Sequence, residues 1–158
     1  LGAKSINEAV IKNWEKIIAD EKIKLFWGTG KDNFEEDTYR MKNFGNSVVK
    51  PYFNNVADIM SASDLVICRA GASTISELIQ LEKPSILIPY DFVGQKENAD
   101  VLEYVNGAKI FTNETADKAV EEAMTLVKQD EMLEFMKENI RKLKKGNAAD
   151  TIIQEMGL

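Results

Sequence analysis

The chain has 158 residues, a formal net charge of −6, 44% hydrophobic residues and 29% charged residues, a composition typical of one globular domain. The acidic balance argues against a nucleic-acid-binding protein, which needs a basic face. The sequence contains no histidine, which excludes a histidine-based nucleophile triad or a histidine-ligated metal within this chain. The single cysteine, Cys68, cannot support a disulfide framework or a metal cluster.

Predicted helices and strands alternate along the first part of the chain. Apolar residues at helical spacing predict a first helix over residues 4–20. The elements expected after it are a strand at 23–27, a helix at 32–44, a strand at 47–52, a helix at 54–62 and a strand at 65–68. The turn 28–31 contains two glycines and a lysine but lacks the rest of a P-loop.

The second part continues the alternation. The expected elements are a helix that starts at Thr74 and stops before Pro84, a strand at 85–88, a helix at 95–105, a strand at 108–111, and helices at 115–128, 131–145 and 147–156. Strands separated by helices of this length indicate βαβ units. We therefore expect an α/β fold, Rossmann-like, with one parallel sheet and flanking helices.

The start of the chain suggests that this sheet is interrupted. Leu1, Gly2 and Ala3 resemble the end of a glycine-rich turn whose preceding strand is absent. In a 3-2-1-4-5 strand order that first strand is central. We expect a cleft, or pairing with another segment, at its position.

The segment 64–78 is predicted to be a strand, a small-residue turn and a helix, an arrangement that binds anions in open α/β sheets. Gly71 permits a positive φ. In the functional interpretation, the backbone of Ala72, Ser73 and Thr74 holds a phosphate. The alternative is an ordinary turn in which Thr74 caps the helix.

Two charged residues near this turn also have two interpretations. Glu77 is spaced to reach a hydroxyl beside the anion, so that a phosphate next to a diol suggests a nucleotide. The alternative is that Glu77 completes a capping box with Thr74. Arg69 is either a charge partner of the anion or part of a salt bridge at the end of the strand, where it would contribute little.

Two other loops are expected at the same edge of the sheet. Gln95 and Asn98 lie three residues apart at a helix start, and amides suit the recognition of sugar hydroxyls. Their alternative role is helix capping. Phe53 and Val56 follow another strand and could flank a flat base.

Together these loops resemble the C-terminal domain of the MurG family, the UDP-N-acetylglucosamine transferases that complete the lipid-linked peptidoglycan precursor. The matching segments are GAKSINEAV, ASDLVICRAGASTISEL and KPSILIPYDFVGQKENA, and the resemblance covers essentially the whole chain. It implies a GT-B architecture in which residues 1–158 form a single donor-binding domain and the N-terminal acceptor domain is absent.

The resemblance also implies roles for the substrate-binding residues. The backbone of Phe53 would meet uracil with Val56 nearby, residues 72–74 would meet the diphosphate, and Glu77 the ribose. Gln95 would contact the sugar hydroxyls, with Asn98 supporting it. Many family members carry a second polar residue where this chain has Gly94, so one sugar contact is expected to be lost or replaced by water.

The implied parent enzyme is an inverting transferase that moves N-acetylglucosamine from UDP-N-acetylglucosamine to lipid I, forming lipid II. It needs no metal or cofactor. Its catalytic base, lipid I site and membrane contact would lie in the absent domain, which would hold it peripherally at the cytoplasmic face of the membrane. The fragment alone is expected to be inactive.

Three alternatives remain open at the level of the sequence. The first is a stand-alone UDP-sugar transferase subunit that works with a separate membrane partner. The second is a GT-B-like UDP-N-acetylglucosamine epimerase, although no acid/base constellation for it is visible. The third is a non-catalytic nucleotide-binding module.

Overall fold

The structure is a computed structural model that describes residues 3–39, 41, 44–91, 94–144 and 157. It is an α/β fold in which every strand pairing is parallel, as the sequence predicts. Among the described residues, no helix is both long and apolar enough to cross a membrane.

The predicted order of elements in the first part of the chain is confirmed. The bounds are shorter than predicted, except that β1 starts later than the predicted strand and includes Gly28 of the predicted turn. The elements are α1 (Lys4–Lys12), α2 (Trp14–Ala19), β1 (Phe26–Gly28), α3 (Phe34–Tyr39), β2 (Val48–Lys50), α4 (Val56–Ala62) and β3 (Val66–Cys68). The single helix predicted over 4–20 is wrong, because the chain breaks at Asn13. The buried Asn13 side chain donates to the carbonyl of Ala9 at 2.9 Å, and this local bond competes with regular helical geometry.

The second part also follows the predicted order. Its elements are α5 (Ala72–Gln80), β4 (Ser85–Leu87), α6 (Gln95–Tyr104), β5 (Ala108–Ile110), the short 3-10 helix η1 (Asn113–Thr115), α7 (Ala116–Leu126) and α8 (Asp130–Lys144). The helix predicted over 147–156, with Gly146 and Asn147 at the boundary before it, lies outside the described residues.

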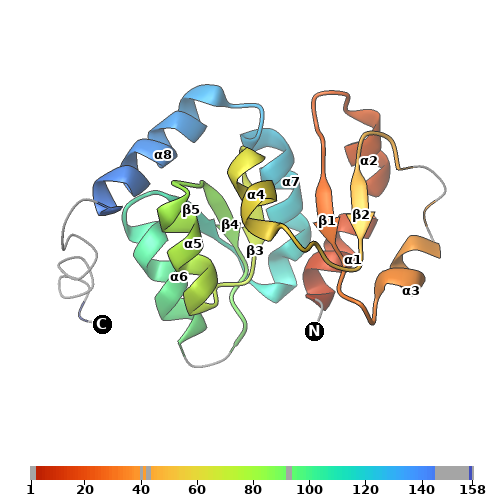
Figure 1. Ribbon diagram of the computed structural model, residues 1–158, viewed down its shortest axis with the longest axis horizontal. Helices are drawn as coiled ribbons and strands as arrows, with labels where there is room; N and C mark the ends of the chain where they lie inside the picture. Colours follow the sequence, from red (N-terminus) through yellow and green to blue (C-terminus); the bar gives the residue numbers. More distant parts are fainter. Residues whose placement is uncertain (1–2, 40, 42–43, 92–93, 145–156, 158) are drawn as a thin grey trace.

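The strands form two separate parallel sheets. One has the order β1-β2 and the other β3-β4-β5, and in Figure 1 they lie side by side with β3 and β1 at the junction. Among the described residues no backbone hydrogen bond joins β1 to β3. The continuous sheet is thus interrupted between these strands, as expected from the sequence.

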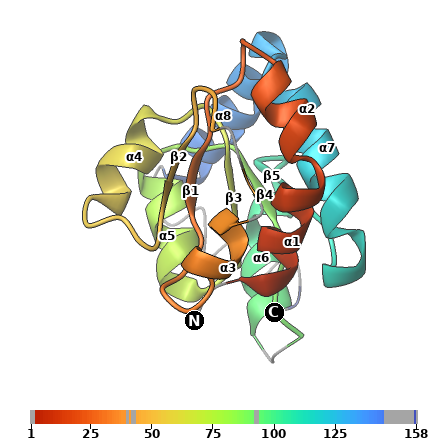
Figure 2. The same cartoon turned by 90° about the vertical axis from the view of Figure 1, so that its right-hand side faces the viewer.

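Two hydrophobic clusters cover opposite faces of the larger sheet. Side chains alternate along β4 and the residue after it, so that Ile86 and Ile88 belong to the cluster with α1 and α7, and Leu87 belongs to the cluster with α5, α6 and α8. Figure 2 shows the same division, with α1, α2 and α7 on one side of the strands and α4 and α5 on the other. These three residues are fully buried and anchor the central strand.

The packing brings several element starts to one edge. Parallel strands connected by helices present their carboxyl ends, and the helix starts that follow them, on the same edge of the sheet. In Figure 1 the starts of α1, α5 and α6 lie along the lower edge. This edge contains most of the side chains expected to bind a ligand.

Candidate functional site

The helix after β3 begins earlier than the sequence predicts. Gly71 is the N-cap of α5, with φ −63° and ψ 150°, and makes no side-chain cap. Gly71 therefore does not use the positive φ that glycine permits, and the alternative in which Thr74 caps the helix is wrong, because Thr74 is the third residue of α5. A glycine is not required at position 71 by the backbone conformation.

The first turn of α5 leaves its hydrogen-bond donors available. The first backbone bond across this helix start runs from the N–H of Ile75 to the carbonyl of Gly71, at 3.0 Å. Among the described residues, the N–H groups of Ala72, Ser73 and Thr74 have no acceptor, and the hydroxyls of Ser73 and Thr74 have no partner. Such a group of N–H donors at the positive end of a helix favours an anion.

Glu77 is not part of a capping box. With Gly71 at the N-cap, Glu77 is the sixth residue of α5 and is exposed. No hydrogen bond or ion pair engages its carboxylate among the described residues. Burial, and secondarily the negative charge of Glu77, raises the pKa of the Cys68 thiol to about 12. Glu77 lies on α5 one turn beyond the free N–H groups.

The start of α6 contacts the same turn. Gln95 Oε1 accepts from the N–H of Ala70 at 3.0 Å and from that of Tyr90 at 3.4 Å. Asn98 Nδ2 donates to the carbonyl of Ala70 at 3.1 Å. The structure thus brings Gln95 and Asn98 together with the turn, as expected, but Asn98 contacts the Ala70 carbonyl instead of Gln95.

The backbone conformation at position 94 favours glycine over a polar residue. It is the N-cap of α6 with φ 97°, a backbone region that glycine adopts without the strain imposed by a side chain. Its N–H donates to the Glu97 carboxylate at 3.0 Å. The absence of a polar side chain here is therefore coupled to the way α6 begins.

Arg69 is engaged within the protein and does not extend a free charge toward the turn. Its Nη1 donates to the carbonyl of Ile88 at 3.0 Å and to Asn113 Oδ1 at 2.6 Å, and its Nη2 donates to Ser5 Oγ at 3.0 Å. Its guanidinium carbon lies 4.0 Å from the Tyr90 ring centroid. We therefore interpret Arg69 as a connector of four segments at this edge. Its predicted role as a charge partner of an anion receives no support from these contacts.

Sequence reasoning did not identify the partners of Arg69. The Ser5 hydroxyl donates to Asn113 Oδ1 at 2.7 Å and accepts from Arg69, so the three side chains close a ring of hydrogen bonds. Ser5 and Asn113 are separated from Arg69 by 64 and 44 residues. No local sequence pattern signals such a contact.

Phe53 and Val56 take no part in this group of contacts among the described residues. Phe53 packs edge-on against Phe26, with ring centroids 6.4 Å apart, and Lys50 Nζ is 5.8 Å from its ring centroid. Val56 is exposed at the start of α4. Among the described residues, no hydrogen bond or ring contact joins either residue to the turn at 70–74. Their expected contact with a base stays a prediction.

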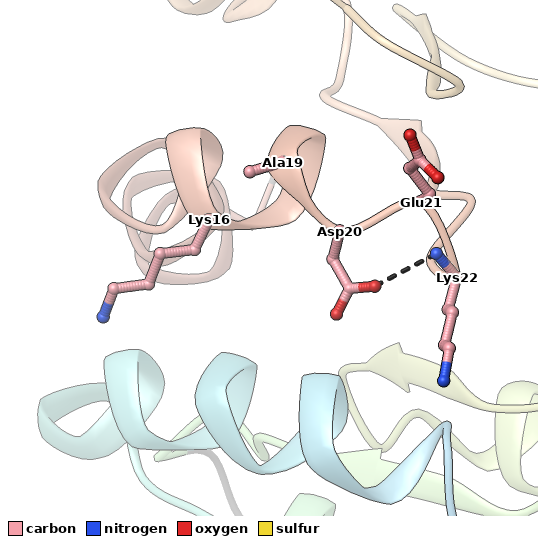
Figure 3. A pocket seen from close by; sticks show the side chains of 5 residues that line it. All are labelled: Lys16, Ala19, Asp20, Glu21 and Lys22. Carbon is pink, nitrogen blue, oxygen red and sulfur yellow. Dashed lines mark hydrogen bonds between the residues drawn. The ribbon is translucent and has the colours of Figure 1, made fainter.

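Two other regions make contacts within the protein. The turn 28–31 is tied into the core, since the carbonyl of the buried Thr29 accepts from Asn7 Nδ2 at 2.8 Å. A shallow depression at the end of α2 is lined by Lys16, Ala19, Asp20, Glu21 and Lys22 (Figure 3). There, the Asp20 carboxylate already accepts from the Lys22 N–H at 3.0 Å and from Lys128 Nζ at 2.6 Å.

No metal site is found in the part of the chain that the structure describes, where no group of three or more cysteine, aspartate and glutamate side chains is placed to hold an ion. The donors at the candidate site are backbone N–H groups, hydroxyls and amides. This set is suited to oxygen-rich anions and sugars.

Comparison with known proteins shows similarity along the whole chain. The model of the glycosyltransferase family 28 C-terminal domain matches residues 1–155. A UDP-N-acetylglucosamine–N-acetylmuramyl-(pentapeptide) pyrophosphoryl-undecaprenol N-acetylglucosamine transferase of Fusobacterium nucleatum is 45% identical, over 100% of this chain and 45% of its own length. A protein of the same name from Desulforamulus reducens is 32% identical, over 97% of this chain and 44% of its own length.

The fold is also found in a solved structure. The crystal structure of Acinetobacter baumannii MurG superposes with a TM-score of 0.75 and 23% identity, over 99% of this chain and 47% of that one. This similarity shows the Rossmann-like fold of one half of a longer protein. The chain spans less than half the length of the relatives named above.

Proposed function

The chain belongs to the glycosyltransferase family 28 C-terminal domain family, and on that premise we propose that it binds the donor of an inverting N-acetylglucosamine transferase. The donor is UDP-N-acetylglucosamine and the acceptor is lipid I, the N-acetylmuramyl-(pentapeptide) pyrophosphoryl-undecaprenol in the names of the relatives. The product is lipid II for peptidoglycan synthesis.

One observation supports this proposal most strongly. The N–H groups of Ala72, Ser73 and Thr74 are unpaired among the described residues, and the carboxylate of Glu77 is unpaired one turn further along the same helix. A diphosphate accepts hydrogen bonds from the N–H groups, and the adjoining ribose donates its hydroxyl hydrogens to the carboxylate. The spacing of one helical turn fits two adjacent parts of one nucleotide.

The proposed chemistry divides between this chain and another domain. An acceptor hydroxyl attacks the anomeric carbon of the sugar, its proton passes to a base, and the bond from that carbon to the diphosphate oxygen breaks with inversion. The donors of α5 stabilise the negative charge that develops on the departing UDP, and they are oriented before the reaction begins. We assign the base, the lipid I site and the membrane contact at the cytoplasmic face to a domain outside this chain.

Calorimetric titration of the chain with UDP, UDP-N-acetylglucosamine, ADP and NAD tests the proposal. We expect the two uridine nucleotides to bind more tightly than ADP or NAD. Glu77→Gln should weaken UDP binding about tenfold, because a charge-assisted hydrogen bond is lost, whereas Glu131→Gln on α8 should leave it unchanged. Preference for NAD, or equal UDP binding by the Glu77 variant, would contradict the proposal.

A further inference from the structure

Both backbone polar groups of Ala70 are held by side chains of α6. Its N–H donates to Gln95 Oε1 at 3.0 Å, and its carbonyl accepts from Asn98 Nδ2 at 3.1 Å. The N–H belongs to the peptide before Ala70 and the carbonyl to the peptide after it. The two contacts therefore restrain both backbone dihedrals of this fully buried residue.

The restrained residue lies in the short link between a strand and a helix. β3 ends at Cys68 and α5 begins at Ala72 after the glycine at its N-cap. Fixing the backbone of one residue costs about 1–2 kcal/mol of conformational entropy, and glycine loses the most freedom. Contacts that order Ala70 before a ligand arrives reduce the part of this cost that binding must supply.

We infer that Asn98 is a positioning residue for the diphosphate, acting through the carbonyl of Ala70. The inference rests on the proposed function, since it assigns the diphosphate to the first turn of α5. Asn98 orients the turn whose N–H groups then face the phosphate oxygens. Removing its amide therefore weakens every ligand that carries the diphosphate, whether or not a sugar is attached.

The same arrangement defines what Gln95 presents to a ligand. Its Oε1 is occupied by the N–H groups of Ala70 and Tyr90, and Nε2 has no partner among the described residues. A Cβ placed on Gly71 would lie 3.7 Å from this Nε2, so the amide nitrogen faces the turn. Gln95 consequently offers hydrogen-bond donors, and its natural partners are ligand oxygens at the junction of sugar and diphosphate.

Binding of UDP and of UDP-N-acetylglucosamine to Asn98→Ala tests the inference. We expect both affinities to fall by a similar factor, about tenfold. Asp100→Ala is the matched control, because Asp100 is on the same helix and pairs with Lys96 at 3.1 Å. It should leave both affinities unchanged. Loss of affinity for the sugar nucleotide alone would overturn the inference and leave the proposed function intact.

The positioning role of Asn98 can also be tested without a ligand, even if the wild-type chain binds no uridine nucleotide. That lack of binding would itself refute the proposed function. Amide hydrogen exchange, followed by NMR, reports the protection of the Ala70 N–H in the free chain. We expect at least tenfold faster exchange of the Ala70 N–H in Asn98→Ala, and the wild-type rate in Asp100→Ala. Unchanged exchange of the Ala70 N–H in the Asn98 variant would overturn the positioning role.

Discussion

Substituting Gly71 by alanine is expected to weaken ligand binding at the proposed diphosphate turn without changing the stability of the fold. The backbone at Gly71 has φ −63° and ψ 150°, a conformation that alanine adopts without strain. An added Cβ would be 3.7 Å from Gln95 Nε2 and 3.9 Å from Thr74 Oγ1, which are ordinary contact distances. The ligand-free protein therefore has room for the methyl group.

The magnitudes predict almost no change in stability. Replacing a glycine in a compatible conformation stabilises a protein by about 0.4–1 kcal/mol through the unfolded chain. Alanine is a poorer N-cap than glycine, by roughly the same amount. We expect the free energy of unfolding to change by less than about 0.5 kcal/mol, because these two effects oppose each other.

Ligand binding should respond strongly. The methyl group would occupy space between the turn and Gln95 that a diphosphate oxygen needs. Losing one charge-assisted hydrogen bond costs about 1.5–3 kcal/mol, which weakens UDP binding about 10- to 100-fold.

Urea unfolding and calorimetric UDP titration of Gly71→Ala check both expectations. Gly94→Ala is the contrasting variant for the unfolding assay: Gly94 has open space around it but φ 97°, so it should lose about 1 kcal/mol of stability. Wild-type UDP affinity in Gly71→Ala would refute the assignment of the diphosphate to this turn.

Three further predictions concern groups outside the turn. The pKa of the Cys68 thiol is about 12, against an ordinary value of 9.0, and only the thiolate reacts with iodoacetamide. Iodoacetamide should therefore modify the folded chain about a thousandfold more slowly than the urea-unfolded chain near pH 8. Equal rates would contradict the raised pKa. The hydrogen bond from Lys128 holds the pKa of Asp20 below its ordinary value. The pair therefore stabilises the fold fully at pH values above the ordinary pKa of an aspartate, and this stabilisation is lost as the pH falls through the lowered pKa. Lys128→Gln should raise the pKa of Asp20 in a carboxyl NMR titration, and an unshifted titration would argue against the pair. Asn7→Ala leaves the Trp27 indole N–H, which donates to Asn7 at 2.9 Å, without its partner, and should cost about 2 kcal/mol in urea unfolding; a loss below about 0.5 kcal/mol would contradict this.

The sequence predicts the order of the elements well because their apolar spacing is a local property. The strands at β3, β4 and β5 and the helices between them follow from short apolar runs and from breakers such as Pro84. The break at Asn13 escapes this reasoning. The apolar stripe continues at helical spacing on both sides of it, and the outcome depends on the buried bond to Ala9.

The site is less predictable because distant contacts determine it. The pattern from Thr74 to Glu77 fits a capping box, but the helix begins at Ala72. The turn before it is held by Gln95 and Asn98, which are 25 and 28 residues from Ala70. Arg69 is likewise oriented by Ser5 and Asn113. Residue types at single positions indicate which chemistry is available, whereas only the fold shows which groups are already occupied.

The interruption between β1 and β3 has a consequence for the behaviour of the chain in solution. Each of these strands leaves one edge without a strand partner among the described residues, and Phe26 on β1 is exposed. Such edges act as templates for strands of other molecules. The net charge of −6 opposes close approach of two copies, but salt screens that repulsion over about 10 Å at 0.1 M ionic strength. Colloidal stability of the chain should therefore be greatest at low ionic strength.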